Sequence, residues 1–320
     1  MTSLPTTSTS LWCRVQALLG DSRIRPVTDA QTNNGACGTL GPITIAVASY
    51  PDPSRRNGRD YGFGAGASTD DARARAVLEA AERYSTSGKA GHHGSAAAFG
   101  LDEAIVAAFV EAVERDAIAI WWYGTVSRPA VDTASFGDPF VEAVTAVLHS
   151  DGHQVTVFDI TSDTGIPVMA ALSVAPDQTF PLLGFGAHFD ARRALRAAVR
   201  ELAMAMWFLP SERRKWHGFT WQRQKHLTPT GQRRSTDFIP WAREPTVEDC
   251  HAVAAAAKTR LEVDNCTQPM VGLPCATVYL PGFSGPTPQS ITARVTDVPA
   301  RMGWTVSTSA TDLNQQFLRM

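Results

Sequence analysis

Two alanine-rich segments of this chain carry the same pattern of charged residues, and that pattern limits how the segments can pack. Glu79–Arg83 and Glu111–Arg115 both read E-A-x-E-R and start 32 residues apart. On a helix, residues three and four positions apart share one face. The glutamates and the arginine of each motif therefore form a charged face, which would be unfavourable in an apolar core. Two such faces turned toward each other would gather four carboxylates, a suitable lining for divalent cations and a polyphosphate. The alternative is a pair of solvated faces, in which glutamate–arginine pairs contribute little.

A second repeated motif lies ahead of the first of these helices and ahead of another helix later in the chain. Gly62–Ala65 and Gly184–Ala187 both read G-F-G-A. Each precedes an alanine-lined helix with a glutamate at the same offset, Glu79 in the first and Glu201 in the second. Alanines four residues apart let a helix lie close to its neighbour, and we expect glycine-rich turns that bulkier residues would resist. The sequence thus predicts internally repeated strand–Gly turn–helix units, with a chance match as the alternative.

Size and charge exclude several classes of protein. With 320 residues and 44% hydrophobic content the chain can bury a large core, and we predict a partly flexible lead-in over residues 1–40 and a single domain over residues 41–320. A net charge of −2 offers no field that attracts nucleic acid or an anionic membrane. No apolar run is long enough to span a membrane. Five scattered cysteines without a C-x-x-C pair predict reduced, buried thiols in the cytoplasm.

Hydrophobic periodicity predicts helices interleaved with strands, which defines the class as α/β with mixed α+β layers. Residues 209–247 are rich in Arg, Lys and Trp and fit either a loop that guides a peptide or nucleic acid, or a plain connector. We expect helices over 11–19, 69–86, 101–120, 138–149, 190–208 and 247–261, and strands over 43–49, 154–159, 166–174 and 274–280.

Common nucleotide-binding motifs are weak or absent in the sequence. Gly62–Ala67 resembles G-x-G-x-x-A, but no long β-branched strand precedes it, so a Rossmann site is not expected. No G-x-x-x-x-G-K-[ST] loop occurs. If the chain uses ATP, it does so without these motifs.

Several segments, taken in order, resemble the YcaO domain. The resemblance runs from about Tyr61 to the C-terminus, and it implies a YcaO-like fold. Its most specific parts are Glu79–Ser85, Glu111–Ala117 and the segment Gly186–His188 with its helix. The matching stretches are Gly64–Ser85, Glu111–Trp122, Asp159–Ala170, Gly184–Leu202, Gly272–Gly282 and Arg294–Trp304.

Resemblance to this family implies an ATP- and Mg²⁺-dependent enzyme that modifies a ribosomally made precursor peptide. In the family a nucleophile attacks a backbone amide, ATP phosphorylates the resulting oxygen, and phosphate leaves. The known products are azolines such as thiazolines (made by cyclodehydratases), thioamides and macrocyclic amidines. No leader-peptide-binding module is recognisable ahead of residue 61, so we expect a partner protein or a second YcaO chain to present the substrate. Homodimerisation is compatible with the resemblance.

The family's nucleotide site uses an E-x-x-E-R, an E-x-x-x-R and an E-x-x-Q element. By resemblance the four glutamates in these elements hold Mg²⁺, and Met204 occupies the Gln position. Arg115 is expected to stabilise the transferred phosphoryl group, and Glu111 to orient Arg115 or bind metal, which gives both a catalytic role. The cofactor-binding residues implied in this way are Glu79, Glu82, Arg83, Glu111, Arg115 and Glu201.

Departures from the family pattern leave other functions open. Arg75 stands where many members have a small polar residue, Ala65 where many have Lys or Arg, and Met204 cannot form the hydrogen bonds of Gln. Residues 314–320 lack the Pro-rich tail of azoline-forming members, which argues against a standard cyclodehydratase. Retention of five glutamates, Glu114 included, favours an active enzyme. The alternatives are a catalytically weak YcaO-like protein that binds the peptide or an active paralogue and, more remotely, a metal hydrolase without ATP.

Overall fold

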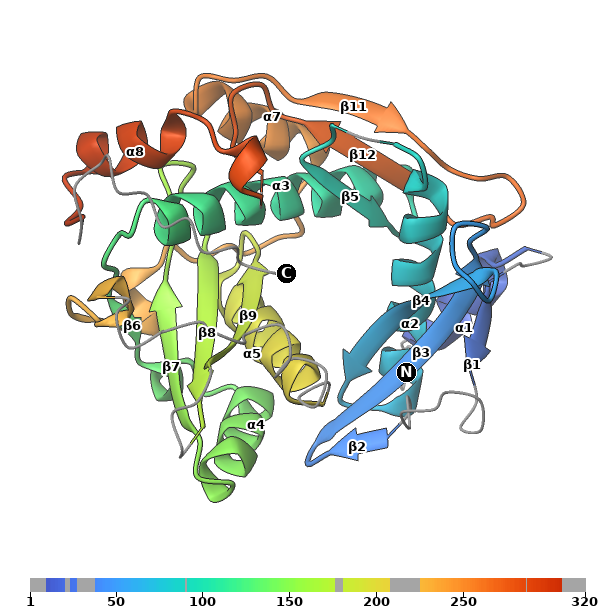
Figure 1. The fold of residues 1–320 in the computed structure, drawn as a ribbon, viewed down its shortest axis with the longest axis horizontal. Helices are drawn as coiled ribbons and strands as arrows, with labels where there is room; N and C mark the ends of the chain where they lie inside the picture. The colour runs from blue at the N-terminus through green and yellow to red at the C-terminus, as the bar shows by residue number, and fades with distance from the viewer. Residues whose placement is uncertain are drawn as a thin grey trace, which may run out of the picture.

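The computed structural model describes residues 10–20, 24–27, 38–89, 91–175, 181–207, 225–285 and 287–306. Helices and strands interleave in mixed α/β layers, as the periodicity predicts (Figure 1). The helices are α1 (Leu11–Leu18), α2 (Thr69–Thr86), α3 (Leu101–Tyr123), α4 (Pro139–Ser150), α5 (Ala191–Trp207), α7 (Val247–Ala256) and α8 (Arg294–Met302). The strands are β1 (Arg25–Val27), β2 (Gly38–Leu40), β3 (Ile43–Pro51), β4 (Arg59–Gly66), β5 (Gly94–Ala97), β6 (Ala130–Val131), β7 (Gln154–Asp159), β8 (Val168–Val174), β9 (Pro181–Ala187), β10 (Gln232–Arg233), β11 (Glu262–Asn265) and β12 (Cys275–Tyr279). Short 3₁₀ helices cover Thr133–Phe136, Lys225–Leu227, Ser235–Asp237 and Pro288–Ser290.

The described strands form three sheets. In the first, β3 pairs antiparallel with β1, β2 and β4. The second has the order β10-β6-β7-β8-β9 and is antiparallel except between β10 and β6. In the third, β12 lies between β11 and β5 and is antiparallel to both. β1 and β2, which precede residue 41, both pair with β3, and the single domain over residues 41–320 remains a prediction.

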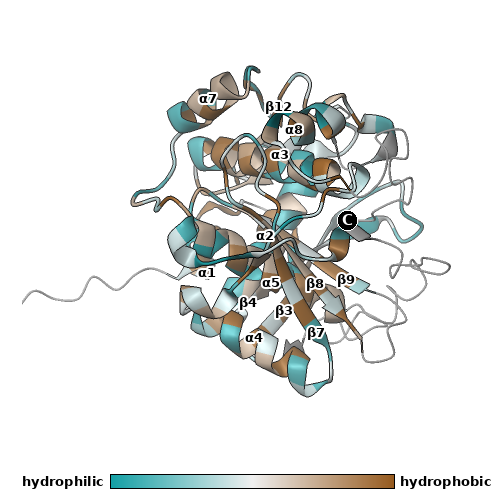
Figure 2. Ribbon diagram, turned by 90° about the vertical axis from the view of Figure 1, so that its left-hand side faces the viewer, coloured by the Kyte–Doolittle hydropathy of each residue, from teal (hydrophilic) through white to brown (hydrophobic). Residues whose placement is uncertain are grey.

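Alternation along the strands places helices on both faces of the second sheet, because successive residues point to opposite sides. Phe158 and Ala170 join the core around α3, whereas Val157 and Ala171 join the core around α4 and α5. The first sheet carries α1 and α2 on one face, and Ile45 on its other face joins the core of α4 and α5. Figure 2 shows the hydrophobic residues concentrated along the strands between these helices. This layering brings α2, α3 and α5 together.

The glycines of the two G-F-G-A motifs lie in strands β4 and β9, so the prediction of glycine-rich turns is wrong. The glycines are required by the neighbouring helices instead. A Cβ on Gly64 would lie 2.2 Å from the carbonyl oxygen of Ala72, and one on Gly184 would lie 2.2 Å from the backbone nitrogen of Leu202. Without side chains at these positions, α2 and α5 pack backbone against backbone on their strands.

Helix boundaries follow the predicted ranges with explicable differences. α2 spans residues 69–86 as predicted, but its N-cap is Ser68, whose hydroxyl accepts a hydrogen bond from the backbone N–H of Asp71. α3 extends past Ile120 to Tyr123, because the aromatic residues there are buried in the core. α7 ends before Lys258, which adopts a left-handed conformation with φ of 59° that stops the helix.

The cysteines of the described residues are free thiols. Cys250, Cys266 and Cys275 are buried, as predicted, whereas Cys13 is exposed because α1 buries only Val15. Cys37, residues 209–224 and residues 314–320 lie outside the described residues. None of the described helices combines the length and hydrophobicity needed to cross a membrane.

Replacing Gly184 with Ala should destabilise the protein by about 1–3 kcal/mol, because the new methyl group would overlap backbone atoms of α5 that cannot turn aside. Urea unfolding followed by circular dichroism measures the change. Gly231→Ala is the matched control, since a Cβ there meets no atom within 4 Å; its effect should stay below about 0.5 kcal/mol. Equal stability of Gly184→Ala and the wild type would contradict the close packing.

Candidate functional site

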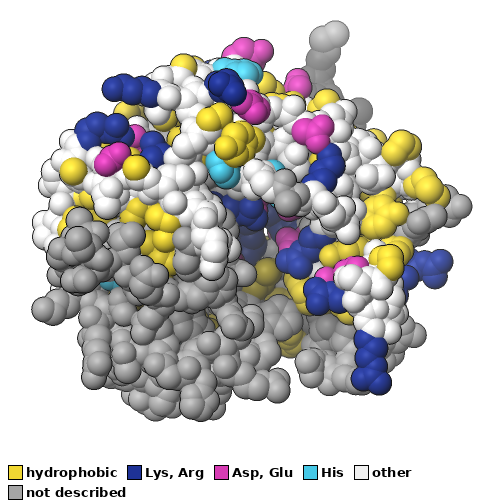
Figure 3. Space-filling view, turned by 45° about the horizontal axis from the view of Figure 1, so that its top comes forward, with side chains coloured by type: hydrophobic (Ala, Val, Ile, Leu, Met, Phe, Trp, Pro, Cys, Tyr) yellow, Lys and Arg dark blue, Asp and Glu magenta, His cyan; other side chains and the backbone are white. Residues whose placement is uncertain are grey.

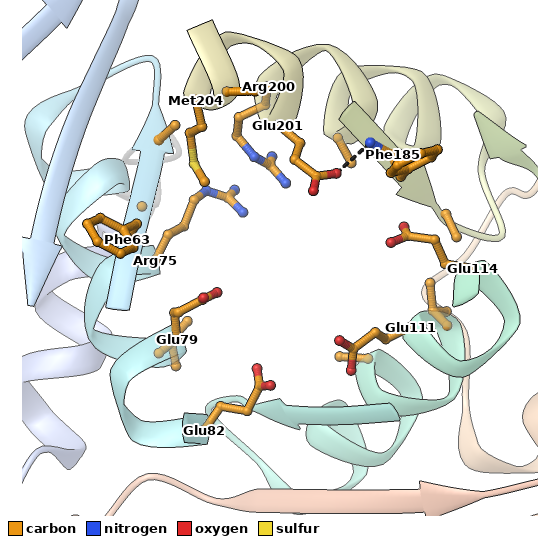
Figure 4. Close-up of a pocket in the computed structure, with 18 of the residues that line it drawn as sticks. Phe63, Arg75, Glu79, Glu82, Glu111, Glu114, Phe185, Arg200, Glu201 and Met204 are labelled. Atoms are coloured by element: carbon orange, nitrogen blue, oxygen red, sulfur yellow. Dashed lines mark hydrogen bonds between the residues drawn. The ribbon is translucent and has the colours of Figure 1, made fainter. Parts of the chain in front are cut away.

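The acidic faces of α2 and α3 meet α5 around one cavity of about 770 Å³. Strands β4 and β9 complete its walls, and the labelled glutamates and arginines point into it from the three helices (Figure 4). In Figure 3 an opening in the surface exposes basic and acidic side chains. The structure therefore brings the predicted glutamates together, while their roles toward a ligand remain predictions. The carboxylates that line the cavity are Glu79, Glu82, Glu111, Glu114 and Glu201.

Ser95, on β5, joins the carboxylates of two helices. Its hydroxyl donates to Oε1 of Glu82 at 2.7 Å, and its backbone N–H donates to Oε2 of Glu111 at 2.6 Å. The residue is only 5% exposed, so these hydrogen bonds are shielded from water. Sequence reasoning missed Ser95 because it lies in a stretch of small residues with no motif of its own.

The two motif arginines occupy different places. Arg83 lines the cavity and pairs with Glu79 at 2.5 Å. Arg115 is not among the lining residues: its Nη2 lies 2.6 Å from Oε1 of Glu111, and its Nη1 donates to the carbonyl of His93 at 3.0 Å. The role predicted for Arg115 toward the phosphoryl group remains a prediction. In the structure its guanidinium contacts Glu111 and the carbonyl of His93, and it holds Glu111 in place.

Burial, and after it mutual repulsion, raises the pKa values of four cavity carboxylates, Glu82, Glu111, Glu114 and Glu201. Burial, and then the charges of Glu201 and Glu111, raises the pKa of Glu114 to about 8. Burial raises the pKa of Glu201 to about 7, although the N–H of Phe185 donates to this carboxylate and opposes the shift. The pKa values of Glu82 and Glu111 are also raised, again chiefly by burial.

Two further arginines line the side of the cavity between α2 and α5. Arg75 binds Asp71 through its Nε at 2.9 Å, whereas Arg200 has no hydrogen bond or ion pair with a described residue. Burial, and then the charge of Arg75, lowers the pKa of Arg200 to about 10. Met204 lies beside them in Figure 4. Arg200 was not predicted from the sequence, because this residue lies just before Glu201 and is not part of the E-x-x-Q element.

The carboxylates and guanidiniums that line the cavity fit Mg²⁺ bound together with phosphate groups. Among the described residues, no three acidic, His or Cys side chains are placed to enclose a metal ion on their own. Five carboxylates against three guanidiniums nevertheless leave the cavity acidic. Mg²⁺ is usually held by one or two carboxylates and by phosphate oxygens rather than by an all-protein cage. Cations would also relieve the repulsion among the glutamates.

A family model described as YcaO cyclodehydratase, ATP- and Mg²⁺-binding, matches residues 88–284. The match covers more than half of the 320 residues, so the chain belongs to the YcaO family. ATP and Mg²⁺ are the cofactors that this family membership assigns to it.

Solved structures agree on the fold. A heterocyclase in complex with substrate and cofactor is 20% identical, with a TM-score of 0.81 over 99% of this chain and 58% of that chain. The heterocyclase TruD is 28% identical, with a TM-score of 0.64 over 72% of this chain and 34% of that one. YcaO from Methanopyrus kandleri, bound with AMPPCP and Mg²⁺, is 17% identical, with a TM-score of 0.65 over 78% of this chain and 85% of that one. The chain spans 30% and 27% of the lengths of the curated relatives that it matches.

The raised carboxylate pKa values should make the ligand-free protein less stable as the pH rises. Unfolded glutamates lose their protons near pH 4.5, whereas folded Glu114 keeps its proton until about pH 8. The folded state therefore binds more protons in this window, and its stability falls as the pH rises through it. Melting temperatures in EDTA between about pH 5 and about pH 9 measure the trend. The fall should be shallower in Glu114→Gln, and an equal slope would contradict the assignment.

Removing the hydroxyl of Ser95 should loosen Glu82 while leaving the backbone hydrogen bond to Glu111 intact. Loss of a group that orients a metal ligand typically costs about 10- to 100-fold in metal affinity, so we expect that loss for Mg²⁺ with ATP in Ser95→Ala, measured by calorimetry. Ser173→Ala is the matched control, because its buried hydroxyl bonds His153 away from the cavity. Unchanged binding in Ser95→Ala would contradict the role of Ser95.

Proposed function

We propose that this chain uses ATP to activate backbone amides of a peptide, and that the cavity between α2, α3 and α5 binds the nucleotide with Mg²⁺. The observation that carries the proposal is the set of five glutamates that converge there with too few cations. Membership of an ATP- and Mg²⁺-binding family of cyclodehydratases supports it. So does the Methanopyrus kandleri relative, which is bound with AMPPCP and Mg²⁺.

The residues of the cavity have two roles: the glutamates supply negative charge, and the arginines hold the glutamates in position. Glu79, Glu82, Glu111 and Glu201 would hold Mg²⁺, with Glu114 adding negative charge. Arg115 fixes Glu111, and Arg83 fixes Glu79, so that the carboxylates stay in place despite their repulsion. Bound ATP supplies the phosphoryl group that turns an amide oxygen into a leaving group.

The apolar part of the cavity lining serves the same chemistry. Phe63 and Leu182 contribute apolar lining beside the charged groups. Apolar walls lower the local dielectric and strengthen the attraction between the glutamates and a bound cation. They also limit the access of water, which would otherwise compete with the amide for the phosphoryl group.

The product depends on the nucleophile rather than on the phosphoryl-transfer residues. A side-chain thiol or hydroxyl would give an azoline, sulfide a thioamide, and an amine an amidine. All three need the same activation of the amide oxygen, so the proposed cavity serves each. We propose a ribosomal precursor peptide as substrate, presented by a partner protein or a second YcaO chain.

Calorimetry with ATP and Mg²⁺ tests the proposal. The wild type should bind ATP in the presence of Mg²⁺, and Glu79→Gln and Glu201→Gln should each weaken binding about tenfold or more, because each removes a charge that faces the metal. Glu103→Gln is the matched control on α3, since Glu103 is exposed and outside the cavity. A wild type that binds no ATP would favour a catalytically weak partner protein.

A further inference from the structure

Arg75 and Arg200 form a positively charged end of the cavity. Their guanidinium groups enter from α2 and α5 and lie across the cavity from Glu111 and Glu114 (Figure 4). Arg75 engages Asp71 through its Nε, and Arg200 has no hydrogen bond to a described residue. Nη groups of both arginines therefore remain available to a ligand.

The neighbourhood of the two arginines calls for an anion. Arg75 and Arg200 both line the cavity, and like charges in a partly enclosed space repel each other. Asp71 pairs with Arg75 at 2.9 Å, and the charges of Asp71 and Glu201 also act on Arg200, but Arg200 forms no salt bridge with a described residue. An anion bound between them would convert the repulsion into two charge-assisted sets of hydrogen bonds.

A phosphate group fits this end better than a peptide carboxylate does. The two guanidiniums approach from different walls, so the ligand needs acceptor oxygens in more than one plane, as a tetrahedral phosphate has. Glu79 and Glu201 also lie nearby and would repel any anion, so the two guanidiniums must outweigh their charge. The glutamates would hold Mg²⁺ when a nucleotide binds, which leaves the arginines for phosphate oxygens.

We propose that Arg75 and Arg200 together bind a phosphate group of the nucleotide directly, so that part of the nucleotide affinity does not depend on Mg²⁺. The proposal rests on the function proposed above and adds two residues that lie outside the three glutamate motifs. Arginine suits the task because its guanidinium stays charged and offers several N–H groups in one plane. Because both arginines contact one anion, their contributions to binding are coupled.

Calorimetric titration of ADP in EDTA isolates the arginine pair from the metal. The wild type should bind ADP under these conditions, and Arg75→Gln and Arg200→Gln should each weaken binding about tenfold or more. The double variant should lose less than the product of the two single losses. Pyrophosphate should compete with ADP for the wild type, whereas acetate should not.

Controls separate a binding role from a structural one. Arg73→Gln makes the same charge change on α2 but lies outside the cavity lining, so its ADP affinity should match the wild type. Thermal unfolding of the ligand-free proteins gives a second measurement. Removing one of two facing cations should leave the melting temperature unchanged or raise it, whereas a structural pair would lower it.

Two results would overturn the proposal without touching the proposed function. One is equal ADP affinity in EDTA for the wild type and both single variants while ATP still binds with Mg²⁺. The other is competition by acetate as strong as that by pyrophosphate, which would mark the pair as a carboxylate site. A wild type that binds no ATP even with Mg²⁺ would instead overturn the proposed function.

Discussion

Repulsion among five partly buried glutamates is the constraint around which this structure is arranged. The glutamates come from α2, α3 and α5, which belong to different layers, so no local interaction brings them together. Four of them are held by specific neighbours. Ser95 and Arg115 hold Glu82 and Glu111, Arg83 pairs with Glu79, and the N–H of Phe185 donates to Glu201. Burial, and after it the charges of neighbouring glutamates, raises the pKa values of Glu114 and Glu201.

A second buried charge group fixes the helix that carries two of these glutamates. Asp116, shortly after Glu114 on α3, is fully buried and binds Arg294 of α8 at 2.8 Å. Arg294 also reaches Asp163 at 2.6 Å, in the connection between β7 and β8. Burial raises the pKa of Asp116, and the guanidinium opposes that shift. Breaking such a buried pair leaves an uncompensated charge, so α8 and the β7–β8 connection help to set the position of α3.

The sequence was sufficient where the prediction depended only on the spacing of glutamates along one helix face. The spacing within E-A-x-E-R identified which glutamates share a face, and four of them do line one cavity. The G-F-G-A motifs were misread because local sequence does not reveal that a helix backbone presses on Gly64 and Gly184 from the next layer. Ser95, Arg75 and Arg200 were missed or misjudged for a related reason: their importance lies in partners on other elements, which spacing alone does not specify.

The glycine-bearing strands and the alanine-lined helices are in tight contact. As a result, the residues that pack these helices differ from the charged residues that face the cavity. α2 and α5 are seated by their small residues on one side, while charged side chains such as Arg75 and Glu79 face the cavity. Substitutions such as Arg75 can therefore accumulate on the open side without disturbing the architecture. A chain built in this way can diverge in ligand preference while its relatives remain superimposable.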